Sequence, residues 1–146
     1  MSITATIEHG NAAAGSTPAQ APAPGRRMRL AGRIISGFVA LFLLMDGVLR
    51  TAGFAPYVEG LVTFGYPGHL APAIGIALVA ATLLYVVPRT AVLGAIVLTG
   101  YLGGAVASHV RMEDRFFVTG IIFGVLVWAG LYLREPRLRA LLPLRS

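Results

Sequence analysis

The sequence predicts an all-α protein: a four-helix transmembrane bundle with a short interfacial helix between the first and second spans. The chain has 146 residues, which is enough for one domain. Of these residues 56% are hydrophobic and only 12% are charged, whereas an average soluble domain has roughly 25% charged residues. Four apolar stretches also have the length, about 20 residues, that a helix needs to cross the hydrocarbon core. Together these observations indicate a membrane protein.

Residues 1–25 are expected to form a disordered cytoplasmic tail. They are rich in Ala, Pro, Gly, Ser and Thr and show no apolar periodicity, so they cannot bury enough surface to offset the entropy of ordering. The membrane domain is expected to comprise residues 26–146. Its first residues include four arginines, which mark the edge of the membrane.

The four spans are predicted near residues 34–52, 69–87, 90–110 and 116–133. The second and third are joined by the tight turn Val87-Pro88-Arg89-Thr90 and must therefore be antiparallel neighbours. A charged loop at 111–115 joins the third to the fourth. Between the first two spans an apolar pattern recurs at helical spacing with Glu59 on the other side, which predicts a short helix in the outer interface. Its residues are Tyr57, Val58, Leu61, Val62 and Gly65.

Arginine placement predicts the orientation. Short cytoplasmic loops of membrane proteins carry the excess of positive charge. With both termini inside, only Arg50, Arg111 and Arg115 face outward, and nine arginines are cytoplasmic: Arg26, Arg27, Arg29, Arg33, Arg89, Arg134, Arg137, Arg139 and Arg145. We therefore expect a multi-pass protein of a bacterial cytoplasmic (inner) membrane with both termini cytoplasmic. This charge pattern indicates a lipid bilayer as the partner and does not indicate a nucleic acid.

Small residues gather on one face of the third span, at Gly100, Gly103, Gly104, Ala107 and Ser108. Helices in lipid associate through close backbone approach at such residues. We expect this face to hold the bundle together. The alternative is that it forms the seam of a homo-oligomer.

Polar residues within the first span provide a candidate site. Asp46 lies about 18 Å along a helix that begins at Ile34, inside a hydrocarbon core of about 30 Å. Arg50 follows one turn later and can pair with it. An ionisable residue at that depth is paired or functional, so the two side chains either fix the helix or form a substrate or proton site.

Histidine placement extends this candidate site. His69 and His109 each lie twenty residues from Arg89, so they reach one level, near that of Arg50. The ligand-binding or polar cluster that we predict consists of Asp46, Arg50, Tyr101, His109 and Arg111. No catalytic residue and no metal ligand is assigned. His69 is expected to be merely solvated at the water interface, and for His109 solvation is the alternative to a role in the site.

Such a cluster suits an anion, a quinone or a lipid headgroup, because arginine and histidine donate hydrogen bonds without an exact coordination shell. The cofactor is unknown: quinone stays open, and a metal completed by Asp46 or Glu113 stays an alternative. Bis-histidine haem is not expected, because these histidines lie at the rim of the bundle. The chain has no cysteine, which excludes thiol chemistry and cysteine-bound metal centres.

Four segments resemble the DoxX-like membrane proteins: GYLGGAVASHVR, VVPRTAVLGAIVLTG, GYPGHLAPAIGIA and RLRALLPLR. The resemblance covers roughly residues 30–144. It implies a four-helix membrane bundle. Because some members of the wider group take part in membrane redox complexes, including thiosulfate–quinone chemistry, it also implies an accessory or binding subunit of a redox system with a redox partner protein. Stand-alone catalysis is not expected. A proton-coupled transporter using Asp46 and a quinone-linked oxidoreductase are the alternatives.

Overall fold

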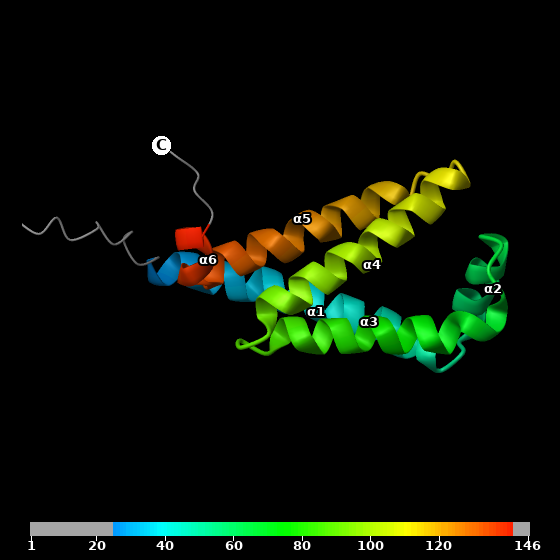
Figure 1. The fold of residues 1–146 in the computed structure, drawn as a ribbon, viewed down its shortest axis with the longest axis horizontal. Coiled ribbons are helices and arrows are strands. Elements are labelled where there is room, and N and C mark those ends of the chain that lie inside the picture. Colours follow the sequence, from blue (N-terminus) through cyan, green and yellow to red (C-terminus); the bar gives the residue numbers. More distant parts are fainter. Residues whose placement is uncertain (1–24, 142–146) are drawn as a thin grey trace, which may run out of the picture.

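The computed structural model describes residues 25–141, and every regular element in that part of the chain is a helix (Figure 1). In chain order the elements are α1 (Arg26–Thr51), α2 (Ala55–Thr63), the 3-10 turn η1 (Gly68–Leu70), α3 (Ala71–Val86), α4 (Ala91–Arg111), α5 (Phe117–Arg134) and α6 (Pro136–Leu141). The spans α1, η1–α3, α4 and α5 are long and apolar enough to cross a membrane. The protein is therefore a multi-pass helical membrane protein, as predicted.

Helix boundaries agree with the predicted spans except at the first one. Helix α1 begins at Arg26 rather than near residue 34, because the helix continues through the arginines, which are good helix formers. The short helix expected between the first two spans is α2, whereas α6 was not predicted. The predicted tail lies, except for Gly25, outside the described residues.

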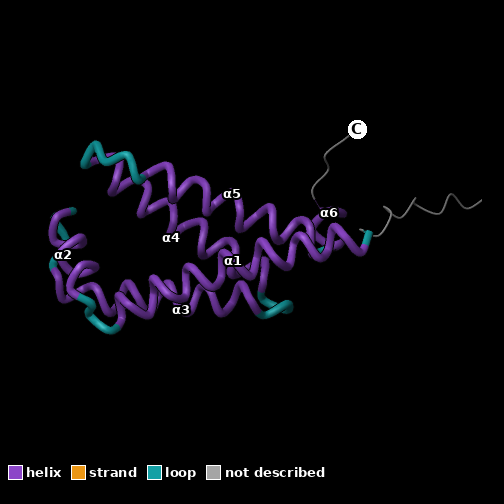
Figure 2. Tube along the Cα trace, turned by 180° about the vertical axis from the view of Figure 1, so that it is seen from behind, coloured by secondary structure: helices purple, strands orange, loops and turns teal. Residues whose placement is uncertain are grey.

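The four spans form a closed ring in the order α1, α3, α4, α5, in which each packs on its two neighbours. Helices α3 and α4 are antiparallel neighbours, as the tight turn between them predicts. Figures 1 and 2 show α1 and α3 as one arm and α4 and α5 as the other. The arms meet at the end that carries α6 and diverge toward the end that carries α2; we call these the α6 end and the α2 end.

Tyr85 on α3 ties the bundle together where the arms meet, and its side chain is completely buried. Its hydroxyl donates to the carbonyl oxygen of Val127 on α5 at 3.0 Å and lies 2.9 Å from Ser36 Oγ on α1. A tyrosine has one hydroxyl proton, so Ser36 is the donor in the second bond. Arg134 donates to the Tyr85 carbonyl at 2.7 Å. Three spans are thus bonded at one point.

Close helix packing uses a different face of α4 from the one expected. Gly94 lies against the backbone of Tyr85, where no side chain would fit, whereas Gly100, Gly103 and Gly104 would meet nothing within 4 Å if each gained a Cβ. The predicted packing role of these three glycines within the bundle is therefore wrong. The buried face of α4 consists of Ala91, Gly94, Ala95, Leu98 and Leu102. A homo-oligomer seam on the exposed glycines remains a prediction.

Candidate functional site

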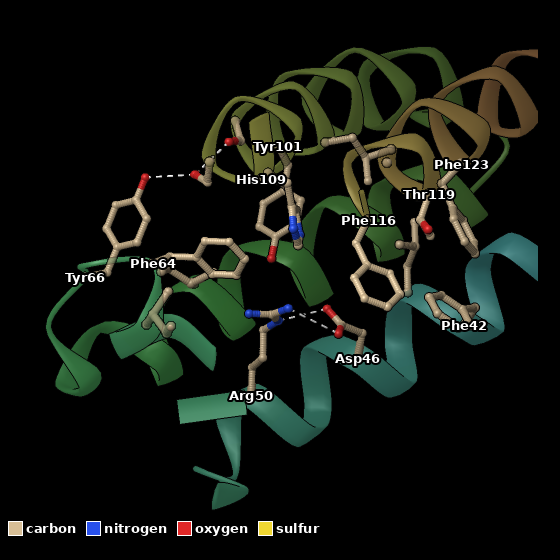
Figure 3. Close-up of a pocket in the computed structure, with 18 residues that line it drawn as sticks. Phe42, Asp46, Arg50, Phe64, Tyr66, Tyr101, His109, Phe116, Thr119 and Phe123 are labelled. Carbon is tan, nitrogen blue, oxygen red and sulfur yellow. Dashed lines mark hydrogen bonds and ion pairs between the residues drawn. The ribbon is translucent and has the colours of Figure 1, made fainter. Parts of the chain in front are cut away.

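A half-enclosed cavity of about 460 Å³ lies between the diverging arms (Figure 3). Its volume falls within the range of small-molecule sites. Most of the wall is apolar and comes from Phe42, Leu43, Leu61, Phe64, Ile74, Leu102, Ala105, Phe116 and Phe123. The polar lining residues are Asp46, Arg50, Tyr66, Tyr101, Ser108, His109 and Thr119.

Asp46 and Arg50 form an ion pair on the cavity side of α1. Arg50 Nε donates to Asp46 Oδ2 at 2.9 Å, and a second guanidinium nitrogen donates to Oδ1 at 3.4 Å. The side chains are 18% and 26% exposed, respectively. The guanidinium also lies 5.1 Å from the ring centroid of Tyr57 on α2. The spacing of four residues thus produces the expected pair, and the two charges neutralise each other.

His109, in the last turn of α4, is oriented by the loop that follows it. Its Nδ1 lies 2.9 Å from Asp114 Oδ2, and because a carboxylate only accepts hydrogen bonds, Nδ1 carries a proton. The backbone N–H of Phe116 donates to the other carboxylate oxygen at 3.2 Å. These two bonds, that from His109 first, hold the pKa of Asp114 below its ordinary value. Asp114 therefore stays ionised and sets the tautomer of His109.

The segment that follows α2 closes the cavity at the α2 end through side-chain contacts with α4. Arg111 donates to the carbonyl oxygen of Phe64, and its guanidinium lies 5.9 Å from the Tyr66 ring. The Tyr66 hydroxyl is 2.9 Å from Ser108 Oγ. The Phe64 ring packs edge-on against His109, with centroids 4.6 Å apart. Five side chains thus join the two arms across the mouth of the cavity, those of Phe64, Tyr66, Ser108, His109 and Arg111.

The structure brings together four of the five residues of the predicted cluster. Asp46, Arg50, Tyr101 and His109 line the cavity, whereas Arg111 is not among the lining residues. Arg111 is exposed at the mouth because its guanidinium is directed to the segment after α2. The ligand-binding role of the cluster remains a prediction.

His69 and His109 are equally far from Arg89 along the chain, which predicts one level for both. His69 is exposed and does not line the cavity. It lies in η1, on the other arm from His109. Equal depth along two helices therefore does not bring the two rings into one site.

Sequence reasoning missed several residues of the site, among them Phe64, Tyr66 and Asp114. Asp114 offered a signal, because an acid a few residues after a helix-terminal histidine can fold back on it. Phe64 and Tyr66 offered none, since their positions depend on how the connection from α2 to α3 crosses to α4.

These features define a multi-pass helical membrane protein with a ligand-sized cavity between its arms. A family model for the DoxX-like family matches residues 34–130, from the first turns of α1 to near the end of α5. The chain therefore belongs to the DoxX-like family, as its segments indicated. Comparison with curated proteins and with solved structures gave no match.

Proposed function

We propose that this protein is an accessory or binding subunit of a membrane redox system and that it holds an amphipathic molecule in the cavity between its arms. The observation that carries the binding role is the cavity itself, which joins a large apolar wall to one polar zone around Arg50 and His109. Ligand sites in proteins have this composition, with a few polar groups that orient the molecule. The redox context is what the family resemblance implies.

We place the protein in a bacterial cytoplasmic membrane with both termini in the cytoplasm and the cavity in the outer leaflet. Arginine placement supports this orientation, because Arg26, Arg27, Arg29 and Arg33 open α1 at the α6 end. The cavity and its ion pair lie toward the opposite, α2 end of the bundle.

A second candidate is a proton-coupled transporter, which the position of Asp46 favours. Its carboxylate lines the cavity and is 18% exposed, as a proton-carrying group must be. In this role the ion pair between Asp46 and Arg50 would have to break during each transport cycle. Proton uptake into vesicles reconstituted with the wild type, but not into vesicles with Asp46→Asn, would support this candidate over the binding subunit.

A third candidate is a quinone-linked oxidoreductase. It requires a bound redox group, so purified protein should carry quinone and turn it over with a reductant. The aromatic wall formed by Phe42, Phe64 and Phe116 is compatible with a planar ring. Protein without quinone and without visible absorbance would count against it.

Filling the cavity tests the proposed function. Gly104 lines the cavity, and a Cβ there meets nothing within 4 Å, so Gly104→Leu should occupy the ligand space without disturbing helix packing. Gly100→Leu is the matched control, because Gly100 has equal free space but does not line the cavity.

The measurement is native mass spectrometry of the full chain purified in mild detergent, followed by extraction of small molecules. Wild type and Gly100→Leu should carry an amphipathic molecule that Gly104→Leu lacks. The same bound molecules on all three proteins, or none on the wild type, would contradict the proposed function.

A further inference from the structure

We propose that the cavity selects a neutral amphiphile whose head carries both a hydroxyl group and a carbonyl oxygen, as a monoacylglycerol does, and that Asp114 is the positioning residue for this selection. This inference rests on the proposed function, since it names the ligand class of the same cavity. It follows from the charges, from the hydrogen-bonding groups and from the shape of the wall.

The charges of the cavity favour a head without net charge. Asp46 and Arg50 already neutralise each other at 2.9 Å. An anionic head would bring a second negative charge to a guanidinium that Asp46 already neutralises, and a cationic head would bring a second positive charge to a carboxylate that Arg50 already neutralises. Either arrangement costs desolvation that a neutral head avoids. Arg111 does not lie in the wall and donates to the Phe64 carbonyl.

The hydrogen-bonding groups on α4 require a donor on the ligand. Asp114 holds the proton of His109 on Nδ1, so in the neutral ring Nε2 is an acceptor with a free lone pair. Among the side chains that the structure describes, His109 is hydrogen-bonded through Nδ1 to Asp114, and Nε2 has no such partner. A ligand hydroxyl group can donate to this atom.

The groups opposite His109 require an acceptor on the ligand. Arg50 has five N–H groups and directs two nitrogens to Asp46, which leaves other donors for a carbonyl oxygen. Figure 3 shows Tyr101 and His109 directed from α4 toward Arg50 on α1. Donor and acceptor sites therefore face each other across the polar zone.

The rest of the cavity suits an acyl chain. Phe42 and Phe123 line it on the side of Asp46 that lies toward the α6 end, and Leu43 also belongs to the lining. Phe42 and Phe123 stack with ring centroids 4.5 Å apart, which forms a continuous apolar surface between α1 and α5. Because the cavity is only half-enclosed, a longer chain can leave it toward the lipid.

Three probes with the same eighteen-carbon tail test the assignment: 1-monooleoylglycerol, oleate and methyl oleate. Each is titrated into the delipidated full chain in detergent, and binding is followed by native mass spectrometry. We expect 1-monooleoylglycerol to bind about five- to tenfold more tightly than methyl oleate, which lacks the hydroxyl group, as one well-placed hydrogen bond allows. We expect oleate, which is charged, to bind most weakly.

Asp114→Asn tests the positioning role, because an amide can donate to Nδ1 and leave the proton of His109 on Nε2. The preference for 1-monooleoylglycerol over methyl oleate should fall to about twofold or less, while methyl oleate still binds. Glu113→Gln is the matched control, since Glu113 is the neighbouring exposed acid, and it should keep the preference. A purely structural role of Asp114 would change both affinities together.

The outcomes separate this inference from the proposed function. Tightest binding by oleate, or an unchanged preference in Asp114→Asn, would overturn the ligand class while the cavity still binds. If Gly104→Leu and Gly100→Leu bind all three probes as the wild type does, the cavity is not the binding site and the proposed function fails as well.

Discussion

At the scale of single residues, the polar side chains that the helices bury are satisfied within the chain. No buried side-chain nitrogen or oxygen of the described residues lacks a hydrogen-bond partner. Thr82, for example, is completely buried on α3 and donates to the Leu78 carbonyl at 2.7 Å. Such pairing is needed in a bilayer, because no water is available there to replace a missing partner.

The Asp46–Arg50 pair gives the first prediction. Asp46→Asn and Arg50→Gln should each lower the thermal stability in detergent, because each leaves one charge uncompensated beside an apolar wall. The double variant should recover part of the loss, with a coupling energy of about 1 kcal/mol or more in a double-mutant cycle. Strictly additive losses would mean that the two side chains do not stabilise each other.

The Tyr85 hydroxyl gives the second prediction. Tyr85→Phe removes its bonds to Ser36 and Val127 and leaves two buried polar groups without their partner, which should cost about 1–3 kcal/mol of unfolding free energy. Tyr66→Phe is the control, because its hydrogen bond to Ser108 is exposed. Its melting temperature should stay close to that of the wild type. Equal losses in both variants would contradict the buried network.

At the scale of elements, α4 shows that one helix can carry two kinds of small residue. Gly94 lies against the backbone of α3 near the turn, and there it permits close approach. Gly100 and Gly103 lie further along, and a Cβ added to either would meet nothing within 4 Å. Sequence spacing alone does not distinguish these two groups, because all of them occur on an apolar helix.

The two glycine positions give the third prediction. Gly94→Ala should destabilise the bundle by about 1–3 kcal/mol, since the added methyl group would overlap the Tyr85 backbone. Gly103→Ala should be neutral or stabilise by up to about 1 kcal/mol, because alanine is the better helix former and the space is free. Thermal unfolding of both variants in one detergent measures the difference. Loss of stability in Gly103→Ala would show that its face is covered in the protein as purified.

Helix α2 depends on the residues that flank it. Gly53 and Gly65 have φ angles of +68° and +80°, a conformation that side chains other than glycine rarely adopt. These two left-handed conformations let the chain turn out of α1, form α2 and then continue into η1. They place Phe64 and Tyr66 within reach of α4.

At the scale of the whole molecule, the divergence of the arms creates the cavity. Large side chains fill the space at the α6 end, where Tyr85, Leu98 and Leu131 are completely buried. Toward the α2 end, in contrast, the cavity wall includes Gly104, which is exposed and has no side chain to fill the space. The bundle is therefore packed at one end and hollow at the other, and its polar zone lies in the hollow part.

Orientation gives the fourth prediction. Single cysteines can be introduced directly, because the natural chain has none. A cysteine in Glu59→Cys should react with an impermeant maleimide in intact cells, whereas one in Gly10→Cys or one appended after Ser146 should react only after the membrane is opened. The reverse pattern would refute the arginine-based orientation.

The pattern of residues along the chain is enough to predict the class of protein, the number of spans, the short helix between the first two and the spacing of the Asp46–Arg50 pair. These features are local: hydropathy over about 20 residues and neighbours one helical turn apart depend only on nearby residues. That is why three of the four spans agree with the structure within about two residues. The first differs because apolarity marks the span and not the whole helix.

The packing of the four spans against one another, in contrast, sets which face of α4 is buried, where the cavity lies and which residues contact His109. The glycines at 100, 103 and 104 fit a packing face by spacing, yet the rotation of α4 against α3 and α5 leaves them exposed. Arg111 and His69 share the level of His109 but not its cavity, because depth along a helix does not specify direction around it. Phe64 and Tyr66 reach α4 from another arm, through contacts more than forty residues apart in sequence, and such contacts arise only when the whole bundle is packed.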